Sequence, residues 1–139
     1  MSNSDKDCFF CNRAKKESIY SSNFLYVVRD NKFPVTKHHT LIAPHRHVSN
    51  FFDLNNKELN DLAKILKNQR QLLLNLDKDI TGFNVGVNVG VDAGQSIMHC
   101  HIHLIPRRKG DMNNPKGGVR GVIPSKQKYN KWIKTISQK

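Results

Sequence analysis

The segment His99-Cys-His-Ile-His-Leu-Ile105 carries a histidine at every second position. Successive side chains of a β-strand point to opposite faces of a sheet, so this spacing predicts a strand with its three imidazoles on one face. Cys100, Ile102 and Leu104 would then turn into the core. A helix would spread the same histidines around its circumference. Three of the seven histidines of the chain lie here, and this strand is therefore the first candidate for a functional site.

Groups suited to binding a phosphate flank this strand on both sides. Gly94-Gln-Ser-Ile-Met98 precedes it with a flexible turn and polar donors, and Pro106-Arg-Arg108 follows it with positive charge. Imidazoles beside arginines and donors can hold a phosphate, but a His-x-His strand can equally place two nitrogens on one metal ion. The residues alone leave nucleotide chemistry and metal-centred chemistry open. A purely structural role is the weakest reading, because burying three histidines requires partners.

Two blocks of sequence resemble one known family. The block Gly94-Gln95-Ser96 through His99-x-His101-x-His103-Leu-Ile-Pro-Arg107 resembles the motif of the histidine triad (HIT) superfamily of nucleotide hydrolases and transferases. The block His39-Thr-Leu-Ile-Ala-Pro44, running on to His47-Val48, is similar to the upstream strand and turn of that family. Asn31, eight residues before His39, and Asn88, before Gly94, also match the family pattern. The resemblance covers residues 8–129, nearly the whole chain.

This resemblance implies catalysis through a covalent nucleotidyl-histidine. His101 would attack the α-phosphorus, because a neutral imidazole is a good nucleophile near pH 7, and water would then cleave the intermediate. His103 would contact the phosphate, and His99 and His39 would complete the catalytic histidines, with His39 orienting the others. His39 could equally be a core histidine bonded to the backbone. The nucleotide would contact His101 and His103 together with Asn31 at the ribose, Asn88, Gly94, Gln95 and Ser96.

The pair Cys8-Phe-Phe-Cys11 indicates either half of a zinc site or a redox pair. A redox role usually needs a thioredoxin-like βαβ context, which the sequence does not predict. Some HIT proteins use such a pair with two histidines to bind a structural zinc, and by position these histidines are His47 and His99. Two thiolates and two imidazoles complete a closed tetrahedral site. Two unliganded thiols remain the alternative, and His38 and His45 match no motif and are expected at the surface.

Size and composition predict one soluble domain. The chain has 139 residues, enough for one core, so we expect a single domain over residues 1–139 with a flexible start at 1–7. No apolar run approaches a membrane span, and the polar start does not resemble a signal peptide, so a cytoplasmic location is expected. The basic segment 107–139 holds ten Lys and Arg against Asp111 alone, a net +9 of the total +12. Nucleic acid binding is possible on this charge but not favoured over a small polyphosphate.

Periodicity predicts an α+β fold, an antiparallel sheet with one long helix and a short C-terminal helix. Strands are expected at 24–28, 40–43 and 83–91, the last pairing antiparallel with the triad strand. Apolar residues at steps of three and four predict the long helix, which Asn55 and Glu58 would begin with a capping box and Leu76 would end. A last helix is expected from Ser125 to Ile136. The HIT resemblance further implies a homodimer with a continuous sheet.

The favoured function is hydrolysis or transfer of a nucleotide, leaning toward dinucleoside polyphosphates. The segment after the triad, which contains Arg107, Arg108 and Arg120, resembles that of microbial HIT proteins described as dinucleoside polyphosphate hydrolases. These arginines could contact the distal phosphates of such a substrate. The alternatives are a purine nucleoside phosphoramidase and a nucleotide-binding module with little catalysis. A metal-dependent hydrolase with all three triad histidines on one ion is a further alternative.

Overall fold

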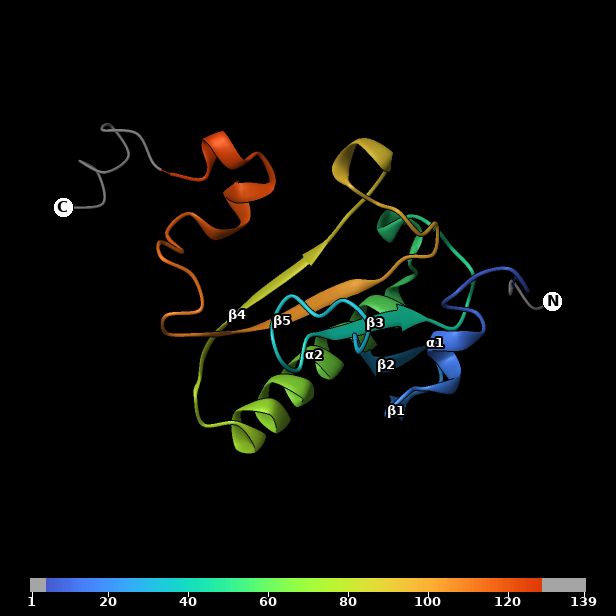
Figure 1. Cartoon of the computed structure of the whole chain (residues 1–139). Coiled ribbons are helices and arrows are strands. Elements are labelled where there is room, and N and C mark those ends of the chain that lie inside the picture. Colours follow the sequence, from blue (N-terminus) through green and yellow to red (C-terminus); the bar gives the residue numbers. More distant parts are fainter. Residues whose placement is uncertain (1–4, 129–139) are drawn as a thin grey trace.

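The computed structural model of this chain describes residues 5–128. A five-stranded antiparallel sheet with the order β1-β2-β3-β5-β4 forms its centre (Figure 1). The predicted α+β class, an antiparallel sheet with one long helix, is confirmed. The strands are β1 (Tyr20–Ser21), β2 (Leu25–Arg29), β3 (Thr40–Pro44), β4 (Ile80–Val87) and β5 (Ile102–Arg108); the helices are α1 (Arg13–Lys16) and α2 (Asn56–Leu76). Short 3-10 turns lie at Phe51–Asp53, Val91–Ala93, Gly118–Val122 and Pro124–Lys126.

Helix α2 begins with the predicted capping box. The Asn55 side chain accepts a hydrogen bond from the Glu58 amide, and the Glu58 carboxylate accepts one from the Asn55 amide, which satisfies two amides that the first turn leaves unpaired. The predicted apolar stripe is buried over most of its length, but Leu72 and Leu76 are 47% and 60% exposed. Leu73, which belongs to the same predicted stripe, is buried and packs with Ile80 and Leu104.

The two faces of the sheet have different coverings. Alternate residues of β2, β3 and β5 pack against α2 on one face, in a core that includes Leu25, Val27, Ile42, Cys100 and Ile102. The intervening residues face the other way, where the N-terminal segment and α1 cover only part of the sheet; this second cluster contains Phe10, Ala14, Tyr26, Val28, Leu41 and Ala43. Because side chains alternate along β5, Ile102 and Leu104 belong to the α2 side and His103 to the partly open side.

Strands β4 and β5 pair antiparallel as expected, but their limits differ from the predicted ones. β4 ends at Val87 rather than at residue 91, because Gly90 adopts φ 93° and turns the chain. β5 begins at Ile102 rather than at His99, since the Cys100 amide bonds to the Val48 carbonyl instead of to a neighbouring strand. His99 and His101 therefore lie just before the strand that was expected to hold them.

The chain beyond β5 stands apart from the sheet, on the side of β4 (Figure 1). Of the helix predicted from Ser125 to Ile136, the described part contains the 3-10 turn at Pro124–Lys126, and residues 129–139 lie outside the described residues. Within residues 5–128, no helix is long and apolar enough to cross a membrane.

Candidate active site and metal site

Four side chains from three distant parts of the chain converge beside the sheet. Cys8 Sγ lies 3.4 Å from His99 Nδ1, and Cys11 Sγ lies 3.3 Å from His47 Nδ1. The two Nδ1 atoms are 3.1 Å apart, and all four possible ligand atoms lie within 4.8 Å of one another. The Cys-x-x-Cys pair and the two histidines that the resemblance implied as zinc ligands therefore form one cluster.

The donor set fits a structural zinc ion. His99 is fully buried, and its Nε2 donates to the Pro44 carbonyl at 2.9 Å, which leaves the Nδ1 lone pair directed at the cysteines. Tetrahedral zinc with bonds of about 2.0–2.3 Å separates its ligands by roughly 3.3–3.8 Å, close to the observed contacts. Burial raises the pKa of the Cys8 thiol, so a cation is needed to hold it as a thiolate at neutral pH. Four protein ligands close the coordination shell, as in structural zinc sites.

His101 presents one nitrogen to an open cavity. Its Nδ1 lies 2.8 Å from the His99 carbonyl oxygen, which only an N–H can approach as a hydrogen-bond partner. The proton of the neutral ring therefore sits on Nδ1, and Nε2 carries a lone pair. Nε2 has no hydrogen-bond partner among the described residues, and His101 lines a cavity of about 580 Å³. This is the arrangement that a nucleophilic imidazole needs.

His103 has the opposite tautomer, fixed by a chain of hydrogen bonds. The Val35 amide donates to His39 Nδ1 at 3.0 Å, so His39 carries its proton on Nε2. His39 Nε2 lies 2.9 Å from His103 Nδ1 and donates to it, which leaves the proton of a neutral His103 on its own Nε2. His103 also lines the cavity. The cavity therefore receives a lone pair from His101 and an N–H donor from His103.

Burial keeps these imidazoles neutral. Burial lowers the pKa of His101 below its ordinary value, and it lowers the pKa of His103 to about 4, helped by the nearby His101 and His39. The negative charge of Asp30 acts in the opposite direction on both pKa values but does not cancel the effect of burial. Near pH 7 both rings are therefore uncharged, as the two tautomers described above require.

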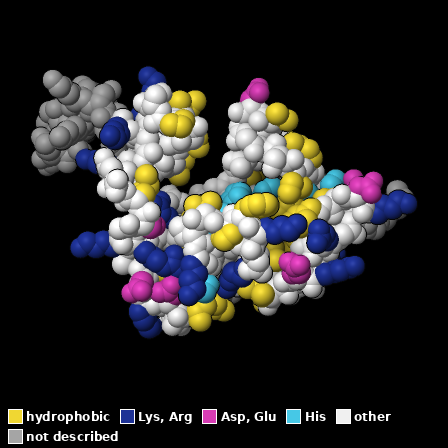
Figure 2. All heavy atoms as spheres, in the orientation of Figure 1, with side chains coloured by type: hydrophobic (Ala, Val, Ile, Leu, Met, Phe, Trp, Pro, Cys, Tyr) yellow, Lys and Arg dark blue, Asp and Glu magenta, His cyan; other side chains and the backbone are white. Residues whose placement is uncertain are grey.

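The cavity opens on the partly covered face of the sheet. Figure 2 shows histidine side chains along the upper surface of the molecule, reachable from solvent and bordered by hydrophobic side chains. Asn31 and Ser96 line the cavity with the two histidines, and Arg13 and Lys32 bring positive charge to it. Its other lining residues are Phe9, Phe10, Ala14, Glu17, Val28, Arg29, Asp30, Phe33, Leu41 and Ile97.

Three of the expected nucleotide contacts lie elsewhere. Gln95 is buried, and its amide is already used by the backbone: Nε2 donates to the Ser49 and Ile97 carbonyls, and Oε1 accepts from the Gly90 amide. Gln95 therefore holds the loop that carries Ser96. Asn88 and Gly94 lie in the same loop region but do not line the cavity. Gly94 adopts φ 96°, which strains any other residue.

The basic residues after the triad do not line the cavity either. Arg107 is paired with Asp111 and donates to Asn84, and Arg108 is paired with Asp77. Arg120 lies in the separate C-terminal segment and is also absent from the cavity lining. The charged residues of the cavity lining are instead Arg13, Arg29 and Lys32 together with the acidic Glu17 and Asp30, and no motif identifies them.

His38 and His45, expected at the surface, are half-buried. His45 Nε2 lies 2.9 Å from the Ser22 carbonyl oxygen and 3.1 Å from Ser21 Oγ, so the ring ties the end of β3 to the β1–β2 turn. A hydrogen bond between turns leaves no periodic trace in a sequence, and reasoning from the motif alone missed it.

Comparison with known proteins identifies the family. The model of the HIT domain matches residues 12–110, which include α1, the whole sheet and the histidine run. The chain belongs to the histidine triad family. The matched region thus includes the cavity histidines His101 and His103 and two of the four clustered residues, His47 and His99, while Cys8 and Cys11 precede the match.

Two curated relatives and one solved structure illustrate the likeness. The chain is 38% identical to a nitrilase and fragile histidine triad fusion protein of Caenorhabditis elegans over 69% of its own length and 21% of that protein. It is 36% identical to a bis(5'-nucleosyl)-tetraphosphatase (asymmetrical) of Schizosaccharomyces pombe over 60% of its length and 45% of that protein. The matches thus span less than half of either relative.

The solved structure is a zinc-bound histidine triad family protein from Mycobacterium smegmatis. It superposes with a TM-score of 0.69 at 26% identity, covering 78% of this chain and 81% of that one. Its bound zinc agrees with the Cys8, Cys11, His47 and His99 cluster, and the predicted zinc site is confirmed as a set of side chains placed to bind one ion.

Proposed function

We propose that this HIT protein is a nucleotide hydrolase or nucleotidyl transferase that attacks an α-phosphorus through His101. The observation that carries the proposal is the orientation of His101. Its Nδ1 proton is held by the His99 carbonyl, and its Nε2 lone pair faces a cavity that His103 supplies with an N–H donor. In-line displacement at phosphorus needs a placed nucleophile and donors for the phosphoryl oxygens, and this cavity offers both.

The reaction proceeds in two displacements. The Nε2 lone pair of His101 forms a bond to the α-phosphorus while the bond from phosphorus to the leaving group breaks, and the leaving group departs with that electron pair. The ring keeps its Nδ1 proton and carries positive charge in the intermediate. His103 Nε2–H and the Ser96 hydroxyl donate to the phosphoryl oxygens, and Asn31 contacts the ribose. Water then attacks phosphorus, the electron pair returns to Nε2, and a proton is released.

A dinucleoside polyphosphate is the favoured substrate. The named activity of the fission yeast relative supports this choice, and so do the cationic Arg13 and Lys32 in the cavity lining, which complement a chain of phosphates. A nucleoside phosphoramidate would use the same nucleophile with an amine as the leaving group. A nucleotide-binding module would keep the cavity but form no covalent bond.

Mass measurement of a trapped intermediate tests the proposal. The protein is mixed with an adenylated substrate and quenched with base, in which a phosphorus–nitrogen bond survives. We expect an adenylate adduct on the wild type and none on His101→Ala, while AMP still binds that variant because binding and chemistry use different groups. Near-normal turnover by His101→Ala would disprove the proposal. Hydrolysis that forms no adduct and is abolished by chelators would favour the metal-dependent alternative.

The substrate preference is tested by comparing diadenosine tetraphosphate with an adenosine phosphoramidate. Lys32→Ala should lower kcat/KM for the tetraphosphate about tenfold more than for the phosphoramidate. A charge-assisted contact to one phosphate is worth about 1.4 kcal/mol, which corresponds to that factor of ten. The loss should shrink at high salt. Arg107→Ala, which removes a positive charge outside the cavity, is the matched control. Equal effects of Lys32→Ala on both substrates would favour the phosphoramidase alternative.

A further inference from the structure

The ring of His101 is packed on two sides. Phe10 lies against one face of it, with ring centroids 4.5 Å apart and planes at 21°. His103 meets it edge-on, with centroids 5.3 Å apart and planes at 62°. Phe10 is only 1% exposed, so water does not compete for this contact. A single hydrogen bond at Nδ1 would let the imidazole tilt about that bond, and the flat face of Phe10 prevents the tilt.

Phe10 is itself held by the metal-binding segment. It lies between Cys8 and Cys11, and its carbonyl accepts a hydrogen bond from the hydroxyl of the buried Tyr26. Its ring also lies 5.6 Å from that of His99, whose Nδ1 belongs to the same cluster of ligands. His99 and Phe10 therefore both contact His101. The His99 carbonyl accepts the hydrogen bond from His101 Nδ1, and Phe10 packs against the face of the His101 ring.

We propose that Phe10 is a positioning residue for His101, which fixes the ring for attack and stabilises the charge that the ring acquires. This inference rests on the proposed function. When Nε2 bonds to phosphorus, the imidazole becomes cationic, and an aromatic face in contact with a cation is attractive. The neutral ground state gains less from the same contact. Phe10 therefore lowers the barrier to the first displacement more than it strengthens nucleotide binding.

The test compares Phe10→Leu, Phe10→Tyr and the control Phe51→Leu. Phe51 is a partly buried phenylalanine that packs on the α2 side of the sheet and does not line the cavity. For each protein we measure zinc content, the dissociation constant of AMP, and the single-turnover rate of adduct formation per zinc-loaded chain. If Phe10→Leu does not bind zinc, Phe10→Met replaces it, because a flexible methionine fills a similar volume.

We expect Phe10→Leu to form the adduct about tenfold more slowly than the wild type, with AMP affinity changed less than about twofold. Phe10→Tyr and Phe51→Leu should stay within about threefold of the wild-type rate. A wild-type rate in Phe10→Leu would overturn the inference, and so would an equal loss in Phe10→Tyr, which keeps the aromatic face. A parallel loss of rate and AMP affinity would also overturn it. Absence of an adduct in the wild type would refute the proposed function itself.

Discussion

Backbone groups decide which nitrogen of each site histidine carries the proton. Carbonyls of Pro44 and His99 accept from His99 and His101, and the Val35 amide donates to His39. Each ring therefore presents one defined nitrogen: a lone pair toward the cysteines at His99, a lone pair toward the cavity at His101 and, through His39, an N–H donor at His103. Which nitrogen each of these histidines presents thus depends on its main-chain contacts, because the side chains themselves are identical.

Replacing His39 tests whether the tautomer of His103 matters for catalysis. His39→Ala removes the donor to His103 Nδ1, so His103 can place its proton on the wrong nitrogen, and kcat should fall by at least about tenfold. The variant should also lose about 1–3 kcal/mol of stability, because removing the buried His39 ring leaves a cavity and takes away the acceptor of the Val35 amide. Steady-state kinetics and urea unfolding measure the two effects. His38→Asn is the control, since asparagine tolerates the φ of 72° at that position, and a loss of kcat there equal to that in His39→Ala would argue against the relay.

At this scale the sequence motifs predicted which histidines share the cavity and which four side chains cluster, but not the hydrogen-bond partners of these residues. The alternation of His101 and His103 indicated a shared face, and both line the cavity. Gln95 was expected to contact phosphate, yet its amide is used by Gly90 and Ile97 of its own loop and by the Ser49 carbonyl of a distant loop. Such contacts depend on where distant loops meet, which no local spacing reveals. Arg13 and Lys32 were missed because they belong to no motif, and Phe10 because it occupies one of the two unspecified positions of the Cys-x-x-Cys pair.

At the scale of elements, an ion pair joins the start of α2 to the loop that carries His47. Arg46 donates to both carboxylate oxygens of Glu58, at 2.7 and 3.0 Å, and Glu58 is 2% exposed. Burial by itself would raise the pKa of Glu58, but the hydrogen bonds from Arg46 and the Asn55 amide outweigh burial and lower the pKa below its ordinary value. The folded state therefore favours the ionised carboxylate.

Glu58→Gln should destabilise the protein by about 1 kcal/mol at pH 7, a modest value because Arg46 is partly exposed. Since the folded pKa of Glu58 is lowered, its contribution is present above the unfolded pKa, near about 4.3, and is lost as pH falls through the folded pKa. The difference in unfolding free energy between wild type and variant should therefore be constant from pH 6 to 8 and shrink below about pH 4. Urea titrations across this range measure it, and a difference that grew on acidification would contradict the assignment.

The Cys-x-x-Cys segment gives a second prediction at this scale. Purified protein should carry about one zinc ion per chain, and Cys8→Ser should lose zinc and stability while reducing chemistry per folded, zinc-loaded molecule much less. Metal analysis and thermal unfolding provide the measurements. Cys100→Ala is the control, because Cys100 is buried on the α2 side and is not a ligand. Substoichiometric zinc in freshly prepared wild type would count against the site.

Element types were predicted better than element ends. The capping box and the apolar stripe located α2 correctly, because both signals are local. The expected strand at 83–91 instead runs from Ile80 to Val87. Val89 and Val91 continue the alternation of valines beyond Val87. The positive φ of Gly90 turns the chain between them, so the strand does not extend to residue 91. A glycine permits such a turn without requiring it, so alternation alone could not locate the end.

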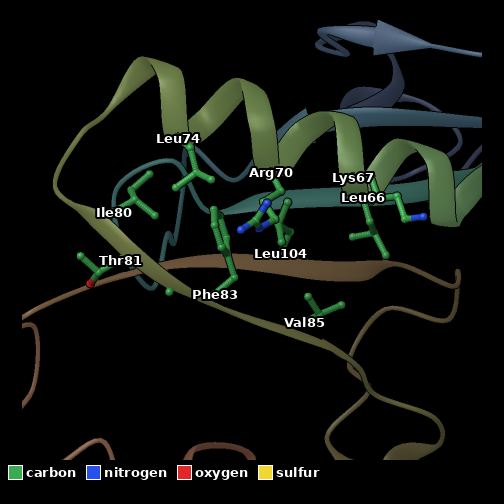
Figure 3. Close-up of a pocket in the computed structure, with 10 residues that line it drawn as sticks. Leu66, Lys67, Arg70, Leu74, Ile80, Thr81, Phe83, Val85 and Leu104 are labelled. Atoms are coloured by element: carbon green, nitrogen blue, oxygen red, sulfur yellow. The ribbon is translucent and has the colours of Figure 1, made fainter.

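At the scale of the whole molecule, β4 lies at the edge of the sheet, and its outer side is unpaired within the described residues. Next to it, α2, β4 and β5 enclose a mostly apolar groove of about 480 Å³ (Figure 3). Figure 3 shows Leu66 and Leu74 of α2 facing Phe83 and Val85 of β4 across this groove. Exposed edges and apolar grooves are commonly covered by a partner. We propose that a second copy pairs along β4, continuing the sheet.

Val85→Lys tests the homodimer. Val85 is 49% exposed on the edge strand, and a lysine there disfavours edge-to-edge pairing. Light scattering at micromolar concentration should give about twice the 16.0 kDa chain mass for the wild type and a monomer for the variant. Ile19→Lys, which lies next to β1 at the opposite edge and is 53% exposed, should remain dimeric. A monomeric wild type would refute the dimer, and a dimeric Val85→Lys would place its interface elsewhere.

The ligand cluster also has a consequence for how the chain matures during synthesis. Cys8 and His99 are separated by 91 positions, so the metal site cannot close until most of the protein has left the ribosome. Until then Cys8 and Cys11 lack the His99 ligand, and the adjacent Arg13, Lys15 and Lys16 offer cleavage positions to trypsin-like proteases. Zinc supply would thus influence how many newly made chains survive, apart from any influence on the rate at which finished molecules work.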